Sequence, residues 1–450
     1  MAKSNKSPIK FLKENNPMKK RQGVVHKFSG SKNALAMRKV VSVLIIWAII
    51  FIAGFFGAEL YARHTQGYEL NSFSLRKSFF YEPDKLKVYN KAFYEQRKDY
   101  FADWPISLVV FEHDKPTPRY LFKPNLNMTT IKGKLVPAKA GDEINWSSNS
   151  WGLRGAEFSI KKPRDTIRIV CLGASTTEGS QSDNETYPFF LEQELGKVYS
   201  EGNIEVINAG HHAMGVDDLL EILKLKVLPL QPDVVIYYQA ANDMQVNDFL
   251  SGIDCKVGWP KGECWLHNSS AAYRWIIDHS AAFVYFSELF GDKSIPEQMP
   301  HTFDISPPKP SAEHYEESLR MIVNETLNNG SKIILSSFIT IAHEGFEIQY
   351  KENPSIFNDL YKKWYPITSS EFEQIFTYFN KKSAEVAYEF DVPYADVAAK
   401  FPKELRYFSY DLIHFTPEGN QLLAKLFAEQ LKKEVLPEII KSQKEGLVNS

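Results

Sequence analysis

The chain has 450 residues, of which 44% are hydrophobic and 24% charged, and its formal net charge is −2. This composition is globular, and the near-zero charge argues against a nucleic-acid-binding protein. The length exceeds what one ordinary hydrophobic core needs, so we expect a main domain with attached segments.

The average charge hides a strongly basic N-terminus. Residues 1–39 contain eleven Lys or Arg and a single acidic residue, Glu14, with little apolar periodicity. This pattern is typical of a disordered, solvated segment. We therefore interpret residues 1–39 as a basic tail.

An uncharged apolar segment, Val40 to Ala58, follows this tail. As a helix it would be roughly 28 Å long, close to the thickness of the hydrocarbon core of a bilayer. We predict one transmembrane helix over residues 40–61, with the basic N-terminus in the cytoplasm and the remainder periplasmic or extracellular. The alternative is a cleavable signal peptide, whose apolar region is usually shorter.

Residues 62–164 form an aromatic-rich connecting region for which the sequence predicts no fold. It includes the stretch N-S-W-G-L-R-G at 149–155. Arg154 in this stretch has two interpretations: it binds an anionic or sugar substrate, or it forms a salt bridge inside the fold.

Residues 165–440 show the alternation of short apolar runs and helical stretches that is typical of a doubly wound α/β domain. Insertions at about 246–311 and 340–369 interrupt it, and loops of that length usually form lids or binding surfaces. The expected strands lie at 166–172, 204–209, 233–240, 332–338 and 392–397, and the expected helices at 187–199, 217–228, 312–328, 370–388 and 417–433.

Two of the three cysteines, Cys255 and Cys264, lie in the first insertion and enclose a segment with Gly258, Pro260 and Gly262. We predict a disulfide between them, as expected in an oxidising compartment; two free thiols are the alternative. The third, Cys171, belongs to an apolar run and is expected in the core.

Polar residues follow the predicted strands at the points where a parallel sheet binds ligands. Ser175 follows the first strand, Gly210 the second and Asn242 the third, while D-L-I-H at 411–414 precedes the last helix. Acyl transfer needs a nucleophile, a base, an acid that orients the base, and oxyanion donors. The candidates in these roles are Ser175, His414 and Asp411, with the N–H groups of Ser175 and Gly210 and the Asn242 amide as donors.

Each signal alone has a simpler interpretation, because Ser175 or the 411–414 segment could merely cap a helix. The order of the signals, each after its own strand, favours chemistry. One of the adjacent histidines His211 and His212, next to Gly210, is a further candidate for the wall of the pocket, with His211 as the named choice; a solvated pair is the alternative. The histidines do not form a metal-spaced cluster, and we expect neither a metal nor another cofactor.

The four blocks G-A-S-T-T, N-A-G, A-A-N-D and D-L-I-H-F-T-P-E-G-N resemble those of the SGNH (GDSL-type) hydrolases. The resemblance implies a flavodoxin-like three-layer α/β/α sandwich with a mainly parallel five-stranded sheet. It also implies Ser175, His414 and Asp411 as the triad, with Gly210 and Asn242 as oxyanion donors. The chain departs from the family in having G-A-S for G-D-S, and Ala240 where glycine is usual.

These observations lead to a membrane-anchored serine esterase that hydrolyses an acetyl or other acyl ester on a glycan, a lipid or a small molecule. An O-acyltransferase of the same fold, modifying envelope or exported polysaccharide, is the first alternative. A non-catalytic glycan-binding or assembly protein is the second.

Overall fold

The structure is a computed structural model of the chain. It describes residues 30–66, 118, 120–131, 134–179, 182–199, 203–258, 264, 275–276, 279–283, 299–350, 356, 360 and 363–448. Most of the predicted basic tail, and parts of the connecting region and of both insertions, lie outside these residues. The chain divides by its contacts into two units, Met1–Ala58 and Glu59–Ser450.

A long helix, α1 (Gly30–Gln66), covers the predicted membrane span. Its segment Lys39–His64 is the one described helix that is long and apolar enough to cross a membrane, a test that a signal sequence also passes. Large apolar side chains such as Trp47 and Phe51 are exposed along it. A soluble core helix would bury such side chains against a partner element.

The second unit contains a five-stranded parallel sheet, which confirms the predicted fold class. The strands follow the order β10-β9-β6-β4-β5. Counted along the chain this is the order 2-1-3-4-5, which is that of flavodoxin-like folds. Their bounds are β4 (Thr166–Gly173), β5 (Asn203–Gly210), β6 (Val234–Tyr238), β9 (Lys332–Ser336) and β10 (Tyr394–Ala395).

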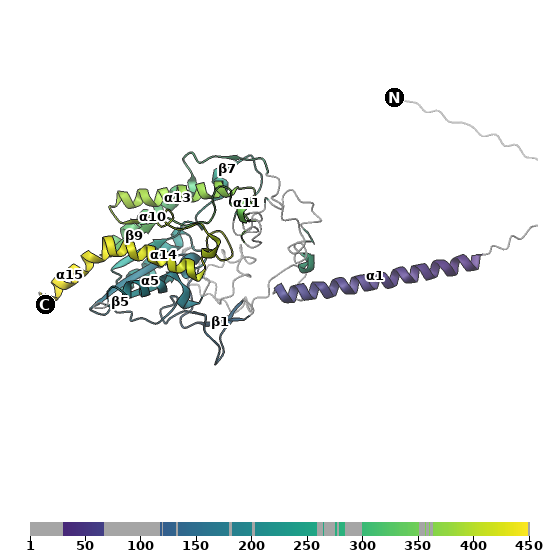
Figure 1. Cartoon of the computed structure of the whole chain (residues 1–450), viewed down its shortest axis with the longest axis horizontal. Coiled ribbons are helices and arrows are strands. Elements are labelled where there is room, and N and C mark those ends of the chain that lie inside the picture. The colour runs from purple at the N-terminus through teal and green to yellow at the C-terminus, as the bar shows by residue number, and fades with distance from the viewer. Residues whose placement is uncertain are drawn as a thin grey trace, which may run out of the picture. The chain divides into compact units, whose positions relative to one another are not determined.

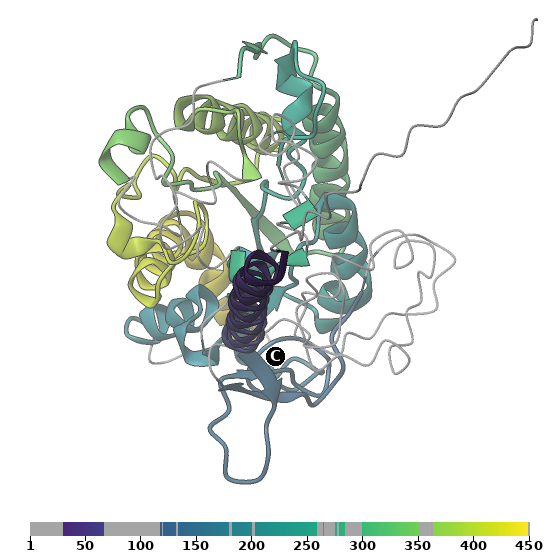
Figure 2. The same ribbon diagram turned by 90° about the vertical axis from the view of Figure 1, so that its right-hand side faces the viewer.

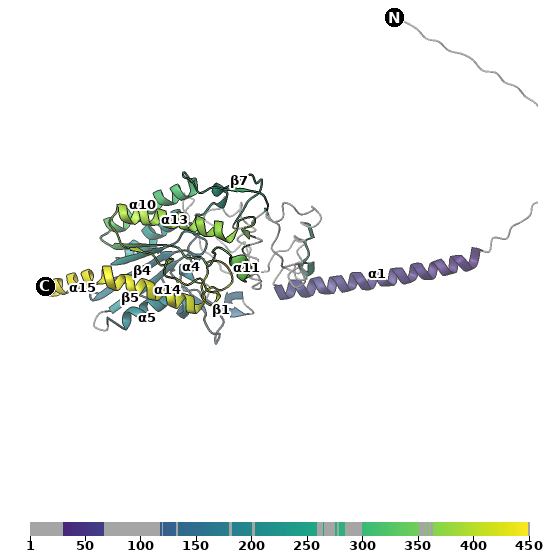
Figure 3. The ribbon, with the colours of Figure 1, turned by 45° about the horizontal axis from the view of Figure 1, so that its top comes forward.

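Helices cover both faces of this sheet. The helices α5 (Tyr187–Gly196) and α14 (Pro417–Gln430) lie on one face, and α10 (Pro310–Asn328) and α13 (Ser369–Glu389) on the other (Figures 1 and 3). The face of α10 and α13 is also covered by α6 (Val216–Ile222), which packs against α10.

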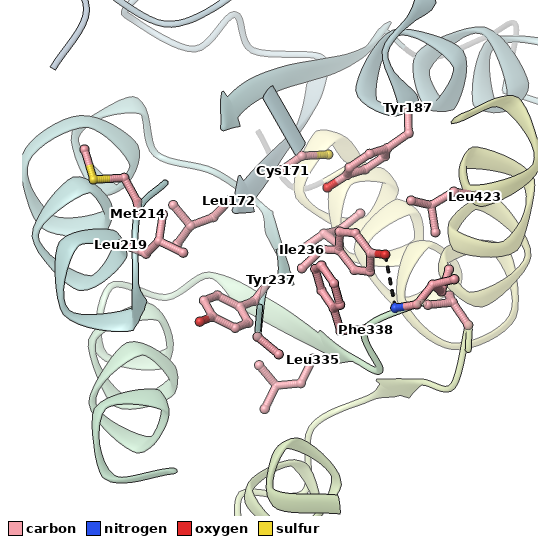
Figure 4. Packing of buried hydrophobic residues seen from close by; sticks show 14 of the residues in the cluster. Cys171, Leu172, Tyr187, Met214, Leu219, Ile236, Tyr237, Leu335, Phe338 and Leu423 are labelled. Carbon is pink, nitrogen blue, oxygen red and sulfur yellow. Dashed lines mark hydrogen bonds between the residues drawn. The ribbon is translucent and has the colours of Figure 1, made fainter. Parts of the chain in front are cut away.

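Alternation along β4 sends successive side chains to opposite layers of the core. Cys171 points toward Tyr187 and Leu423, whereas Leu172 points toward Met214 and Leu219 (Figure 4). The thiol of Cys171 is buried and not bonded to another cysteine, so it belongs to the core as the sequence predicts.

Three elements differ from the sequence-based expectation. The last strand has only two residues, because only Tyr394 and Ala395 of the apolar run find partners in β9. The helix expected to reach Leu228 continues from α6 as a π-helical turn (Leu223–Val227) and a 3-10 turn (Leu228–Leu230). Pro229 has no N–H to donate there, so the regular pattern cannot continue. The C-terminal helix runs on through Leu431–Val435 into α15 (Leu436–Val448).

The connecting region contributes a small antiparallel sheet, β2-β1-β3. Its strands are β1 (Asn127–Ile131), β2 (Lys134–Pro137) and β3 (Trp146–Ser147). This segment, blue in Figure 2, lies at the edge of the α/β domain. Arg154 pairs with Asn208 of β5 through an isolated bridge, so the region is joined directly to the central sheet.

Short elements complete the two insertions. The strands β7 (Leu250–Ser251) and β8 (Thr302–Phe303) pair near the two ends of the first insertion, and α11 (Phe346–Tyr350) lies in the second. Among the described residues there are further 3-10 turns, namely η2 (Asp183–Glu185), η5 (Val246–Phe249) and η7 (Leu405–Tyr407). The four-residue helix α4 (Ser175–Glu178) follows β4.

Candidate active site

Ser175 is the first residue of α4, directly beyond the carboxyl end of β4. The turn requires Gly173, because a Cβ at that position would lie 2.4 Å from the carbonyl oxygen of Tyr238 and 2.1 Å from Thr177 Oγ1. The close approach of β6 and α4 therefore fixes where the hydroxyl of Ser175 emerges.

The structure brings Ser175, His414 and Asp411 together. Ser175 Oγ lies 2.8 Å from His414 Nε2, and His414 Nδ1 lies 2.6 Å from Asp411 Oδ2. With a proton on Nδ1, His414 donates to the carboxylate and presents a bare nitrogen to the hydroxyl. The three side chains are mostly buried, although the serine and the histidine are 239 residues apart.

Asp411 is held by its own backbone as well as by the imidazole. Its Oδ1 accepts hydrogen bonds from the N–H groups of Ile413 and His414, at 3.0 and 2.8 Å. Burial alone would raise the pKa of Asp411, but His414 and these donors outweigh it and hold the pKa well below its usual range. The carboxylate is therefore ionised and can stabilise an imidazolium. Tyr410 stacks on the His414 ring, with centroids 5.1 Å apart.

These three residues line a pocket of about 370 Å³. Its other polar side chains are His212, Asn242 and Lys363, and the remaining lining is apolar or aromatic: Ala213, Ala241, Met244, Trp364, Phe372, Phe376, Tyr410, Leu412 and Ile413. A concave, mostly apolar site with a few convergent polar groups is typical of a small-molecule site.

The expected oxyanion donors differ in their positions. Asn242 lines the pocket, and one hydrogen of its amide is donated to the carbonyl of Met214 at 2.9 Å, so a second hydrogen remains. Gly210 does not line the pocket, and its N–H donates to Asn208 Oδ1 at 2.9 Å. In the loop after Gly210, His212 and Ala213 line the pocket, and Ala213 has a left-handed φ of 58°.

Gly210 has a packing role instead. A Cβ there would lie 2.0 Å from the backbone nitrogen of Glu178, so only glycine lets β5 approach α4 this closely. The structure therefore explains the glycine at position 210 by the close contact between the backbones of β5 and α4.

The chain matches the family model described as "GDSL-like Lipase/Acylhydrolase family" over residues 171–422. The chain belongs to this family. The matched segment includes Ser175, Asn242, Asp411 and His414. As a GDSL-like acylhydrolase it is an ester-bond hydrolase.

Solved structures of GDSL-type proteins were also found. A lipase/acylhydrolase from Enterococcus faecalis is 16% identical, with a TM-score of 0.35 over 59% of this chain and 95% of its own. A lipolytic protein of the G-D-S-L family from Desulfitobacterium hafniense is 14% identical, with a TM-score of 0.35 over 59% and 99%. Axe2, an acetylxylan esterase from Geobacillus stearothermophilus, is 16% identical, with a TM-score of 0.34 over 59% and 94%. No curated protein matches the chain.

His211, the candidate for the pocket wall of this acylhydrolase, does not line the pocket. It is fully buried and stacks on Phe122, with centroids 4.6 Å apart, and burial lowers its pKa to about 4. The neighbouring His212 lines the pocket instead. A pair of adjacent histidines left the choice open, and only the course of the loop decides it.

Arg154 forms the salt bridge that was one of its two interpretations. Its Nε lies 2.9 Å from Asp183 Oδ1, and its Nη1 donates to the carbonyl oxygens of Glu178 and Gly179. It is not among the residues that line the pocket of Ser175. The guanidinium therefore stabilises the C-terminal end of α4 by bonding its carbonyl groups.

Glu178 is a feature of the site that the sequence did not indicate. Its Oε1 accepts from the indole N–H of Trp146 at 3.2 Å, and its Oε2 lies 3.8 Å from His212 Nδ1. Burial raises the pKa of Glu178 to about 7, because it outweighs the opposing effects of Arg154 and Trp146. The only local signal is its position, three residues after Ser175 in the same turn.

The structure joins Cys255 and Cys264 by a disulfide, with the sulfurs 2.11 Å apart. Cys264 is fully buried. The predicted pairing and the observed connection are therefore the same.

Proposed function

We propose that this acylhydrolase is a membrane-anchored serine esterase in which Ser175 is the nucleophile, His414 the general base and Asp411 the residue that orients it. The contact of Ser175 Oγ with His414 Nε2 at 2.8 Å carries the proposal. Hydrogen-bonding distance between a hydroxyl and a base oriented by an ionised carboxylate is the geometry that activates a serine.

Acylation begins when His414 Nε2 takes the proton of Ser175 Oγ as the oxygen attacks the ester carbonyl. The tetrahedral oxyanion accepts hydrogen bonds from the N–H of Ser175 and from the remaining amide hydrogen of Asn242. Asp411 stabilises the imidazolium. His414 then gives its proton to the departing alcohol, which leaves Ser175 acylated.

Deacylation repeats these steps with a second nucleophile. In an esterase, water loses a proton to His414 and attacks the acyl-serine. In an O-acyltransferase, the hydroxyl of a sugar acceptor does the same. The two activities share the first half-reaction, so only the product formed with and without an acceptor separates them.

The proposed anchor is α1. Its exposed apolar side chains over Lys39–His64 support insertion into a bilayer, and the basic residues before it support a cytoplasmic N-terminus. The catalytic unit then faces the periplasm or the exterior. There it hydrolyses its substrate, an ester on a glycan, a lipid or a small molecule. A reporter fused after residue 70 tests this orientation, and activity of that reporter only inside the cell would contradict it.

The test of the mechanism is Ser175→Ala, assayed with p-nitrophenyl esters and a fluorophosphonate probe. Loss of the nucleophile should reduce kcat by roughly 10³-fold or more and abolish labelling. The matched control is Ser159→Ala, because Ser159 is exposed and its hydroxyl donates to the nearby carbonyl of Lys161. Unchanged turnover in Ser175→Ala would exclude Ser175 as the nucleophile and favour the non-catalytic alternative.

A further inference from the structure

One wall of the pocket is a group of aromatic side chains, which we call the aromatic wall: Trp364, Phe372 and Phe376. Trp364 packs edge-on against Phe372 at 4.8 Å, and Phe372 against Phe376 at 5.1 Å. Trp364 belongs to the second insertion, and the two phenylalanines to the start of α13. The wall is therefore not built from the strand ends that carry Ser175.

The first insertion packs directly on this wall. The N–H of Gly258 donates to the carbonyl of Lys363 at 2.9 Å. Gly258 has a left-handed φ of 103°, and a Cβ there would lie 2.7 Å from Cζ3 of Trp364. Only glycine fits this contact, so the segment before position 259 fixes the position of the indole.

Two further connections hold that segment in place. Asn247 accepts from the N–H of Val257 at 3.0 Å and donates to the carbonyl of Cys255 at 3.0 Å. The disulfide joins Cys255 to the buried Cys264, whose N–H donates to the carbonyl of Lys256 at 3.3 Å. We call this arrangement around residues 255–258 the disulfide brace.

Further apolar side chains adjoin the aromatic wall in the lining of the pocket. Met244, Leu412 and Ile413 line it together with the aromatic wall. An acetyl group offers a single methyl to such a surface, whereas each additional methylene removes more apolar area from water. A pocket of about 370 Å³ with this lining is suited to a longer chain.

We infer that the aromatic wall makes this enzyme selective for esters with an apolar acyl group longer than acetyl, and that the disulfide brace positions the wall by holding Trp364. This inference rests on the proposed function of Ser175. It assigns Trp364 a role in specificity, and Gly258 and the disulfide a positioning role.

The first test measures kcat/KM of the full-length chain for p-nitrophenyl acetate, butyrate and hexanoate. We expect an increase of roughly fourfold for each methylene. Alkyl acetates of increasing alcohol length form the second arm. If kcat/KM does not change with acyl length, or rises only with the length of the alcohol, the inference is wrong even though labelling by the fluorophosphonate probe still depends on Ser175. If labelling no longer depends on Ser175, the proposed function itself is wrong.

The second test compares Gly258→Ala with Gly252→Ala. Both glycines have a left-handed φ, 103° and 81°, but a Cβ at Gly252 meets nothing within 4 Å. Gly258→Ala should raise KM for the hexanoate several-fold while leaving the acetate kcat near that of Gly252→Ala. Mild reduction of the disulfide in the wild-type chain should have the same effect. Equal acyl profiles for both variants and for the reduced chain would refute the role of the brace.

Discussion

The two sides of the pocket are held in different ways. Ser175 follows a fully buried strand of the parallel sheet, and Asn242 follows the neighbouring strand, so the hydrogen-bond register of the sheet fixes them. Trp364, another residue that lines the pocket, depends on contacts between two insertions, above all on that with Gly258. In the proposed mechanism the chemistry therefore depends on the central sheet, and the selection of the acyl group depends on inserted segments.

The largest expected difference between the two sides comes from a matched pair of asparagines. Asn242→Ala removes a proposed oxyanion donor and should lower kcat by roughly 10²- to 10³-fold for every acyl length. Asn247→Ala removes only hydrogen bonds of the disulfide brace, so it should raise KM for long acyl esters and leave kcat for the acetate unchanged. Similar kinetic effects of both variants would contradict the division between the two sides.

A smaller effect on stability and kcat is expected from Arg154, which bonds the carbonyls at the end of α4. Arg154→Met leaves buried carbonyls without their donor and should lower the free energy of unfolding by about 2–3 kcal/mol. Because α4 carries Ser175, kcat should fall as well. Arg168→Met is the control, since Arg168 pairs with Glu205 on β5 and bonds the carbonyl of Leu230. It should cost stability without a loss of kcat in the folded fraction, as measured by urea titration and active-site labelling.

The smallest effect concerns Glu178, whose pKa is raised by burial to about 7. Between about pH 4.5 and 7, this carboxyl is therefore protonated in the folded chain and ionised in the unfolded chain. The stability contributed by this carboxyl is complete below that window and is lost as the pH rises through it. Glu178→Gln should remove this dependence, on the order of 1–2 kcal/mol, from the difference between urea titrations at pH 5 and pH 8. An unchanged difference would show that Glu178 is ionised throughout.

Sequence patterns predicted the sheet because its strands are buried on both faces. The run Thr166–Gly173 is mostly apolar and buried throughout, and helices have clear caps, as at Thr416 and Pro417 before α14. The edge strand Tyr394–Ala395 was predicted too long, because an apolar run does not reveal how many of its residues find a partner.

The candidate site was predicted from the order of several weak signals. Ser175 or the Asp-x-x-His segment could each merely cap a helix, and only their positions after successive strands favoured a shared site. The difference lies in the loop after β5: Gly210, expected as an oxyanion donor, and His211 do not line the pocket, whereas His212 and Ala213 do. Two adjacent positions in a loop point in different directions, and local composition does not say which one faces the ligand.

By itself, the sequence determined the doubly wound architecture, the apolar N-terminal helix and the residue types available for acyl transfer, because periodicity, capping and strand ends are local properties. Only the tertiary structure decided that Ser175 meets His414, that Arg154 bonds the carbonyls at the end of α4, and that Gly258 packs on Trp364. Those contacts join segments tens to hundreds of residues apart, and their geometry depends on how the whole core closes.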